Sequence, residues 1–149
     1  MTTTVTRTEQ IVIAASLDAV WEYTQDYCRR WEWDATVLIF REGEGTGGTV
    51  HALTLGGLRC TLRRTLVEHP RRSGFLLVNV ESPWVAGGGG EWLYEPTPGG
   101  TRWTQTNSLV VQPDLPPRQL RLLIAWQLGM GTRRAMEAAR TCIEAECRT

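Results

Sequence analysis

The stretch WLYEPTPGGTRWTQT, residues 92–106, decides the fold of this chain more than any other. Segments in which apolar and polar residues alternate flank the turn residues Thr97–Gly100, and alternation around a proline–glycine turn predicts a β-hairpin. A turn over these four residues pairs Tyr94 with Trp103. Cross-strand partners share a face of a sheet. In this register one face carries Trp92, Tyr94, Trp103, Gln105 and Asn107.

This hairpin is the last of a series. Strand-like segments separated by glycine or proline turns are expected at 36–42, 49–55, 58–69, 74–82, 91–96 and 101–111, after a first strand at 9–15. Short links of this kind join antiparallel neighbours. The run Gly87–Gly90 has two interpretations, a mobile loop at a pocket rim or a bulged strand start beside Trp84. Neither resembles a phosphate-binding loop, because GxGxxG and a following lysine are both missing.

Helices are expected at both ends of the strand series. Ser16 is a candidate N-cap for a short helix over 17–27, and a second short helix is expected near Cys28–Trp31. After the proline-rich break at 112–117, apolar residues recur every three or four positions through 118–148, which predicts a long C-terminal helix. Gly129 and Gly131 either kink this helix or let it pass close to the sheet. We therefore predict one α+β domain over residues 1–149, with a sheet of about seven strands.

The composition fits a small globular domain with balanced charge. Sixteen basic and sixteen acidic side chains give a net charge of zero, which offers no electrostatic support for binding nucleic acid or an anionic membrane. No apolar run approaches the ~20 residues of a membrane-spanning helix. The four cysteines and two histidines lack metal-ligand spacing. We expect a cytoplasmic protein with free thiols, no metal and no cofactor, as a monomer or homodimer.

Three parts of the sequence carry a resemblance: IVIAASLDAVWEYTQD (11–26) followed by RRWEWDATV (29–37), the hairpin at 92–106, and the closing helix. Together they resemble the helix-grip fold of the START-related superfamily, which includes birch-pollen-allergen-like proteins and bacterial polyketide cyclase/dehydrases. The resemblance implies a curved sheet wrapped around the C-terminal helix, with the short helices closing one end and an apolar ligand in between. Members of this superfamily share architecture far more than catalytic residues.

The tryptophans near the short helices are either core or pocket. If the resemblance holds, Trp21 faces the core, while Trp31 or Trp33 lines the pocket floor; the alternative is that all three only pack. On the hairpin, Trp92 and Trp103 offer flat surfaces for stacking, and Gln105 and Asn107 offer hydrogen bonds to the polar edge of a ligand. We take Trp33, Asn79, Trp92, Trp103, Gln105 and Asn107 as candidate ligand-binding residues, Asn79 on the strand register described next.

The register of the earlier strands supplies further candidates. A two-residue turn at Gly56-Gly57 pairs His51 with Leu62, which puts His51 and Arg64 on the inward, apolar face. The strand at 74–82 is apolar on both faces. If Phe75 faces inward, then Asn79 and Glu81 do too, whereas a slip of one residue turns both outward.

Four residues are candidate catalytic groups. Arg64 or Tyr94 would polarise a carbonyl, and His51 or Glu81 would move a proton. Each has a structural alternative: His51 as a hydrogen-bonded sheet histidine, Arg64 as a sheet-edge residue, Glu81 as a solvated strand end and Tyr94 as packing.

The leading functional hypothesis is a polyketide cyclase/dehydrase-like protein. It would bind a hydrophobic or aromatic small molecule and favour an aldol-type cyclisation, with or without dehydration, by confining it. One alternative is a non-catalytic carrier or sensor with the same pocket. Another is a protein-interaction module that uses exposed aromatic residues such as Trp84 and Trp126.

Overall fold

The computed structural model describes residues 3–42, 49–54, 57–114 and 118–148. Within these ranges the chain forms the predicted α+β fold. In chain order the elements are β1 (Thr3–Ile13), α1 (Leu17–Gln25), η1 (a 3-10 helix, Tyr27–Glu32), β2 (Val37–Glu42), β3 (Thr49–Thr54), β4 (Arg59–Glu68), β5 (Arg72–Glu81), β6 (Val85–Thr97), β7 (Gly100–Val111) and α2 (Arg118–Cys147).

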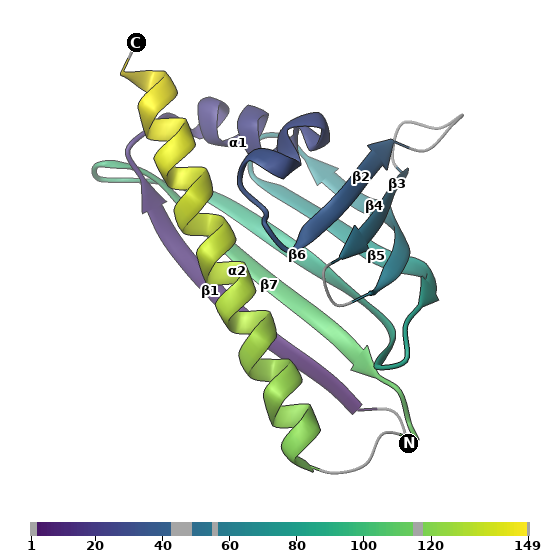
Figure 1. Ribbon diagram of the computed structural model, residues 1–149. Coiled ribbons are helices and arrows are strands. Elements are labelled where there is room, and N and C mark those ends of the chain that lie inside the picture. Colours follow the sequence, from purple (N-terminus) through teal and green to yellow (C-terminus); the bar gives the residue numbers. More distant parts are fainter. Residues whose placement is uncertain (1–2, 43–48, 55–56, 115–117, 149) are drawn as a thin grey trace.

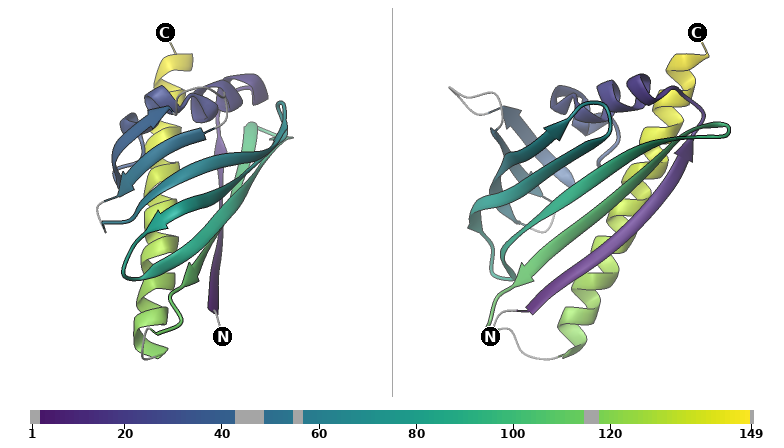
Figure 2. Two further views of the ribbon diagram at one scale, coloured as in Figure 1. Left: turned by 90° about the vertical axis from the view of Figure 1, so that its right-hand side faces the viewer. Right: turned by 180° about the vertical axis from the view of Figure 1, so that it is seen from behind.

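All seven strands belong to one antiparallel sheet in the order β1-β7-β6-β5-β4-β3-β2. Strands β2 to β7 follow one another along the sheet, and β1 returns to pair with β7 at the far edge. The sheet is curved, and α2 lies on its concave side along β1 (Figures 1 and 2). The helices α1 and η1 lie across one end of the sheet (Figure 1). This is the helix-grip arrangement that the resemblance implied.

The hairpin β6–β7 forms as predicted and carries the centre of the core. Tyr94 is opposite Trp103, and Trp92 is opposite Gln105. The strands turn at Pro98-Gly99, where Gly99 has a φ of 91°, a conformation that favours glycine. Trp103 is fully buried and packs edge-on against Trp92, with ring centroids 5.4 Å apart. Aromatic pairs prefer this geometry over face-to-face contact.

Both short helices begin at a side chain that caps them, Ser16 for α1 and Asp26 for η1. The Ser16 hydroxyl accepts a hydrogen bond from the Ala19 amide at 3.2 Å, so the predicted N-cap of α1 is confirmed. The helix ends at Gln25, two residues earlier than expected. Asp26 is extended there, and its carboxylate accepts from the Cys28 amide at 3.1 Å, which starts η1.

Helix α2 runs without a break through both of its glycines. Gly129 is buried, and a Cβ added there would lie 2.9 Å from the Arg7 guanidinium of β1. A Cβ at Gly131 would lie 3.4 Å from Thr36. The glycines therefore let α2 pass close to its neighbours, which was one of the two expectations. Among the described residues, no helix has both the length and the apolarity to cross a bilayer.

The predicted register of β3 against β4 is wrong by one residue. Leu53 lies opposite Arg59 and Ala52 opposite Cys60, and His51 lies opposite Thr61 rather than Leu62. The turn is longer than the predicted two residues, because it is closed by a hydrogen bond from the Thr54 amide to the Leu58 carbonyl at 2.9 Å. A slip of one position exchanges which side chains of a strand face inward.

The glycine run Gly87–Gly90 belongs to β6 and is not a rim loop. The register of β6 against β7 shifts between Val85 and Gly87, so the strand start is bulged, as the second interpretation expected. From Gly87 onwards each glycine pairs with a residue of β7. The run therefore lies within the sheet, between β5 and β7.

Candidate functional site

A cavity of about 830 Å³ lies between the concave face of the sheet and the N-terminal half of α2. Its walls come from strands β2 to β7, from the segment that joins η1 to β2, and from α2. The cavity exists because α2 packs along β1, while the curve of the sheet carries β2 to β5 away from the helix (Figure 2). Pockets for drug-sized ligands have volumes of roughly 300–1,000 Å³, so the space suits a small molecule of several rings.

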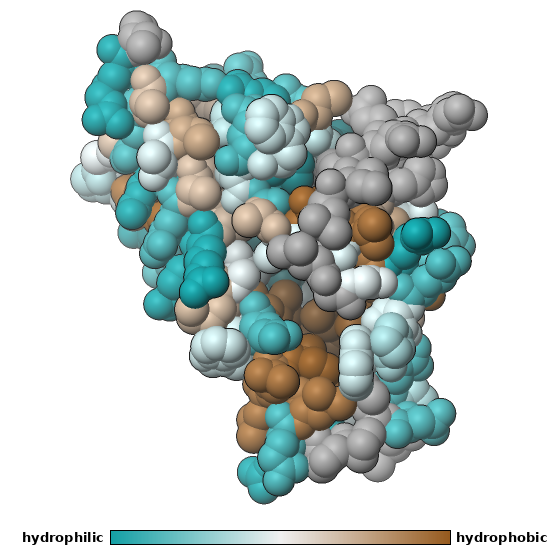
Figure 3. Space-filling view, viewed as in Figure 1, coloured by the Kyte–Doolittle hydropathy of each residue, from teal (hydrophilic) through white to brown (hydrophobic). Residues whose placement is uncertain are grey.

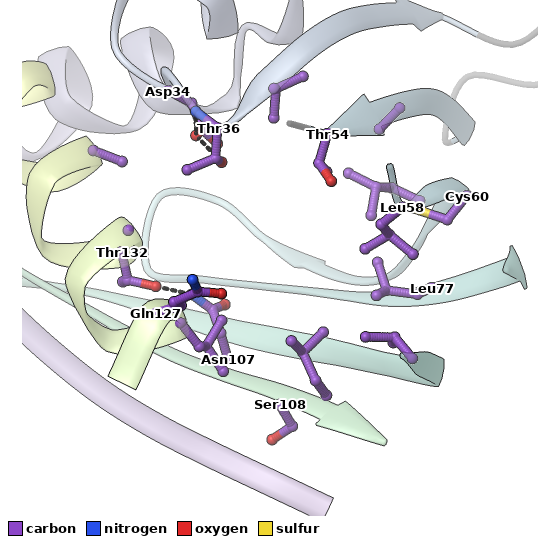
Figure 4. Close-up of a pocket in the computed structure, with 18 of the residues that line it drawn as sticks. Asp34, Thr36, Thr54, Leu58, Cys60, Leu77, Asn107, Ser108, Gln127 and Thr132 are labelled. Carbon is purple, nitrogen blue, oxygen red and sulfur yellow. Dashed lines mark hydrogen bonds between the residues drawn. The ribbon is translucent and has the colours of Figure 1, made fainter. Parts of the chain in front are cut away.

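Most of the wall is apolar. Leu58, Cys60 and Leu77 lie together on the side of the cavity remote from α2 (Figure 4). Burial raises the pKa of the Cys60 thiol, so this side chain is a neutral part of the wall at neutral pH. Apolar residues that line the rest of the cavity include Leu62, Phe75, Val85, Leu109, Ile124 and Leu128.

The wall is open to solvent beside the start of α2. Trp84 is 44% exposed and Leu123 is 47% exposed, yet both line the cavity. Figure 3 shows apolar side chains in and around a hollow on this face, next to the N-terminal half of α2. An apolar ligand would therefore pass apolar side chains on its way in.

Polar side chains gather where β7 faces α2. Trp92 Nε1 donates to Asn107 Oδ1 at 3.2 Å. Asn107 Nδ2 in turn donates to Gln105 Oε1 at 2.8 Å and to Thr132 Oγ1 of α2 at 3.3 Å. Figure 4 shows Asn107 and Thr132 lying toward each other across the gap between sheet and helix. The network fixes the orientation of both amides.

A second polar group lies at the η1 end of the cavity. Arg30 Nε donates to Asp34 Oδ2 at 2.9 Å, and both side chains are nearly buried. Asp34 Oδ1 also accepts from the Thr36 hydroxyl at 2.6 Å. The Arg30 guanidinium lies over the rings of Trp33 and Trp92, 4.6 and 5.0 Å from their centroids. Both charges of this buried pair are thus held by the protein itself.

Two lining residues of the cavity each contain a buried donor with no hydrogen-bond partner. The donors are the indole nitrogen of Trp33 and the amide nitrogen of Gln105, and their side chains belong to residues that are 2% and 3% exposed. A buried donor that is left unpaired costs about 1–3 kcal/mol. Both nitrogens are enclosed by the protein, so the cavity itself does not reach them.

The structure brings four of the predicted ligand-binding residues to this cavity. Trp33, Trp92, Gln105 and Asn107 all line it. Trp103 is fully buried behind Trp33 and Trp92 and is not part of the lining. Of the other early tryptophans, Trp21 is in the core, as expected, and Trp31 is 74% exposed.

Asn79 and Glu81 lie outside the cavity. Phe75 and Leu77 of β5 do face it, as one interpretation expected. The register of β5 against β4 then shifts between Val78 and Glu81, and Asn79 has a φ of 51°. This bulge breaks the alternation of side chains, so Asn79 and Glu81 are both exposed. The inward positions expected for these two residues are therefore wrong.

The predicted catalytic residues Arg64 and Tyr94 are also absent from the lining. Arg64 Nη2 donates to the Gln25 carbonyl at 3.0 Å, and its guanidinium lies 4.3 Å from the centroid of the Tyr27 ring. Tyr94 is fully buried, and its hydroxyl is 2.8 Å from both Thr24 Oγ1 and Gln25 Nε2. Both side chains hold the first helices against the sheet.

The side chain of His51 lies outside the described part of the structure. Its backbone is in β3, opposite Thr61. The argument that expected His51 to point inward used the pairing with Leu62, and that pairing does not form. His51 therefore remains a prediction from the sequence alone.

Sequence reasoning missed Arg30, Asp34 and Thr132. The first two are four residues apart in RRWEWD, a spacing that brings side chains together on one helical face. Thr132 stands beside Gly131 in α2, where a small residue indicates close packing. Both features are visible in the sequence, but neither of them indicates a cavity.

Comparison with known proteins supports the architecture. A family model described as polyketide cyclase / dehydrase and lipid transport matches residues 3–144. No curated protein matches the chain.

Solved structures with the same fold include aromatase/cyclases. The Zhui aromatase/cyclase from Streptomyces sp. R1128 is 19% identical, with a TM-score of 0.81 over 100% of this chain and 98% of that one. The di-domain aromatase/cyclase StfQ from the steffimycin biosynthetic pathway is 14% identical, with a TM-score of 0.76 over 98% of this chain. The present chain spans 53% of StfQ. A START superfamily protein from Mycobacterium smegmatis is 11% identical, with a TM-score of 0.74 over 95% of this chain and 98% of that one. At these identities the likeness concerns the fold.

Proposed function

The chain belongs to the polyketide cyclase / dehydrase and lipid transport family, and from this premise we propose that it binds a polyketide-type molecule in its cavity and promotes an aldol-type cyclisation or dehydration. The observation that carries the proposal is the cavity of about 830 Å³, which combines an apolar wall with a few fixed amides and indoles. The fold neighbours that are named as aromatase/cyclases support the same chemistry.

Confinement is the means of catalysis that this site supports best. In an intramolecular aldol reaction, an α-carbon of one ketone unit bonds to the carbonyl carbon of another, and the proton lost from the α-carbon ends on the new hydroxyl. Loss of water then gives a double bond. A flexible poly-ketone can close several different rings in water. Holding one folded form can lower the barrier to one closure by several kcal/mol.

A second candidate function is that of a carrier, with the same ligand and no turnover. One observation favours it: Arg64, Glu81 and Tyr94 do not line the cavity. Asp34 does line it, but both of its carboxylate oxygens accept hydrogen bonds from Arg30 and Thr36. His51 is the remaining candidate for a proton-transfer group among those that the sequence suggested.

Two neighbouring leucines of β5 make a matched test of the cavity. Leu77 lines the cavity, whereas Leu76 is 44% exposed and does not. We expect Leu77→Trp to fill part of the space and to abolish binding of a hydrophobic ligand, and Leu76→Trp to leave it intact. Ligand extracted from freshly purified protein and identified by mass spectrometry gives the chemical class. Equal binding by wild type and Leu77→Trp would contradict the proposal that this cavity holds the ligand.

Product analysis separates the enzyme from the carrier. A synthetic linear poly-β-ketone is incubated with no protein, with wild type, and with the Leu77→Trp, Leu76→Trp and His51→Ala variants, and ring products are resolved by chromatography and mass spectrometry. A cyclase shifts the distribution toward one ring in wild type and Leu76→Trp but not in Leu77→Trp. A carrier binds the compound and leaves the distribution as it is without protein. Loss of the shift in His51→Ala would identify the proton-transfer group.

A further inference from the structure

The two glycines in the middle of α2 have different surroundings. A Cβ added at Gly129 would lie 2.9 Å from the Arg7 guanidinium, so the missing side chain there leaves space for a residue of β1. A Cβ added at Gly131 would lie 3.4 Å from the Thr36 methyl group, and no other atom outside the helix backbone would lie within 4 Å of it. Thr36 is exposed, so its methyl group can shift slightly. The packing of α2 therefore leaves space for an alanine at position 131.

The space beside Gly131 belongs to the cavity. Gly131 lines the cavity, as do Gln127 and Leu128 on the preceding turn and Ala135 on the following turn. Residues three or four positions apart lie on one side of a helix, which places Gly131 in the middle of the side of α2 that faces the cavity. Figure 4 shows Gln127 and Thr132 on the part of α2 that borders the cavity. Side chains in a helix lean towards its N-terminus, so one at position 131 would extend over Leu128 along the same wall.

Neither the backbone nor the packing of α2 accounts for a glycine at position 131. The helix is continuous from Arg118 to Cys147. Glycine in a helix interior is less stable than alanine, because it loses more conformational freedom on folding. At Gly129 the close approach of Arg7 explains the glycine. At Gly131 the missing side chain instead widens the cavity by the volume that a side chain would fill.

We propose that Gly131 determines how large a ring system the cavity accepts. With glycine at this position, the rings of a ligand can lie directly against the backbone of α2. A larger residue would occupy the same volume and exclude part of a large ligand, while a small ligand would keep enough space. The inference rests on the proposed function, because it concerns the size of the ligand that is held in the same cavity.

Two fluorescent alcohols of different size test this role by equilibrium dialysis. 1-Pyrenemethanol has a larger fused-ring system than 1-naphthalenemethanol, and both carry the same hydroxymethyl group. We expect the ratio of the affinity for pyrenemethanol to that for naphthalenemethanol to fall about twofold in Gly131→Ala and about tenfold in Gly131→Leu, since added atoms overfill the space that the larger probe needs. The affinity for naphthalenemethanol itself should change by less than about twofold in both variants.

Ala125→Leu is the control variant. Ala125 lies in the same half of α2 and is partly exposed, but it does not line the cavity. A leucine there should leave the affinity ratio as it is in wild type. An equal fall of the ratio in Ala125→Leu and Gly131→Leu would show that the effect does not come from the cavity wall, and would overturn the inference.

The stability of Gly131→Ala without ligand is an independent readout. Because alanine favours the helix and has space at this position, the variant should melt about 2–4 °C above wild type. A variant that is more stable and yet selects against the larger probe separates a role in ligand size from a structural role. A lower melting temperature would mean that packing against Thr36 requires the glycine, and the inference would be wrong.

The binding results distinguish this inference from the proposed function. If both probes bind wild type and their affinity ratio is the same in Gly131→Ala and Gly131→Leu, Gly131 does not set the size limit, while the ligand-binding cavity stands. If neither probe binds wild type, both the size limit and the proposed function lose their support. If Gly131→Leu does not fold, as judged by circular dichroism, the affinity ratio in Gly131→Ala decides.

Discussion

Tyr94 has a different place in the structure from the one its sequence context suggested. It faces the interior of the hairpin, as predicted, but its hydroxyl is held by Thr24 and Gln25 of α1 and does not reach the cavity. Burial raises the pKa of this phenol well above its ordinary value of about 10. The neutral phenol therefore stabilises the fold fully below its ordinary pKa of about 10. This stabilisation is lost as the pH rises from there towards the raised pKa of the folded protein.

We predict that Tyr94→Phe is a stability variant and not a catalytic one. Loss of the hydroxyl removes two hydrogen bonds and should lower the free energy of unfolding by about 1–2 kcal/mol, measured by urea denaturation at pH 7. The affinity for a hydrophobic ligand of the cavity should stay within about twofold of wild type, because Tyr94 does not line the cavity. If the variant kept its stability and ligand affinity but lost cyclisation, Tyr94 would have the catalytic role that the sequence suggested.

At the scale of the element, β6 depends on the absence of side chains where β5 approaches it. A Cβ added at Gly89 would lie 2.5 Å from the Phe75 carbonyl oxygen of β5, which is backbone and cannot rotate away. A Cβ at Gly87 would meet no atom within 4 Å. The two glycines belong to the same run and differ mainly in this contact. Gly89 also lines the cavity, so the close approach of β5 and β6 shapes the site.

We predict that Gly89→Ala destabilises the protein by about 1–3 kcal/mol, since the strands must move apart to admit the methyl group. Gly87→Ala should be neutral or slightly stabilising, because alanine loses less backbone freedom on folding. Thermal unfolding of the two variants beside wild type makes the comparison. Equal melting temperatures for both variants would show that β5 and β6 are not as close as described.

At the scale of the whole molecule, ion pairs join helices and strands that are distant in the sequence. Arg29 of η1 is ion-paired with Glu32 of the same helix and with Glu146 near the end of α2. Arg133 of α2 is ion-paired with Glu9 of β1 at 3.0 Å. These contacts hold α2 to η1 and β1, while the cavity lies against the N-terminal half of the same helix.

The pair between Arg29 and Glu146 gives a prediction about pH. The hydrogen bond from Arg29 holds the pKa of the Glu146 carboxyl below its usual value. Its contribution to stability is therefore present above that usual value and is lost as the pH falls through the lowered pKa. We expect carbon NMR titration to show Glu146 titrating at lower pH in wild type than in Arg29→Gln, with a smaller difference in high salt.

Arg148→Gln is the control for this titration. Arg148 lies at the same end of α2 as Glu146, but its side chain donates a hydrogen bond to the Glu144 carbonyl instead. Glu146 should titrate in this variant as it does in wild type. Identical titration of Glu146 in wild type and Arg29→Gln would mean that the ion pair between η1 and α2 does not form in solution.

The sequence by itself determined the elements and their order. Alternation of apolar and polar residues marked the strands, Ser16 marked the start of α1, and the Pro98-Gly99 turn set the pairing of Tyr94 with Trp103. Each of these features depends on residues close together in the chain, whose backbone preferences act locally. Four of the candidate ligand-binding residues line the cavity; the choice of three followed from the hairpin register and that of Trp33 from the family resemblance.

Only the tertiary structure decided which side chains meet at the cavity. The extra residue in the turn before Leu58 and the bulge at Asn79 each shift a strand by one position, and no local signal of the sequence fixed either shift. The bond from Asn107 of β7 to Thr132 of α2 joins elements that only the closed fold brings together. The hollow itself follows from the distance that the curved sheet keeps from α2, which is a property of all seven strands at once and of no single segment.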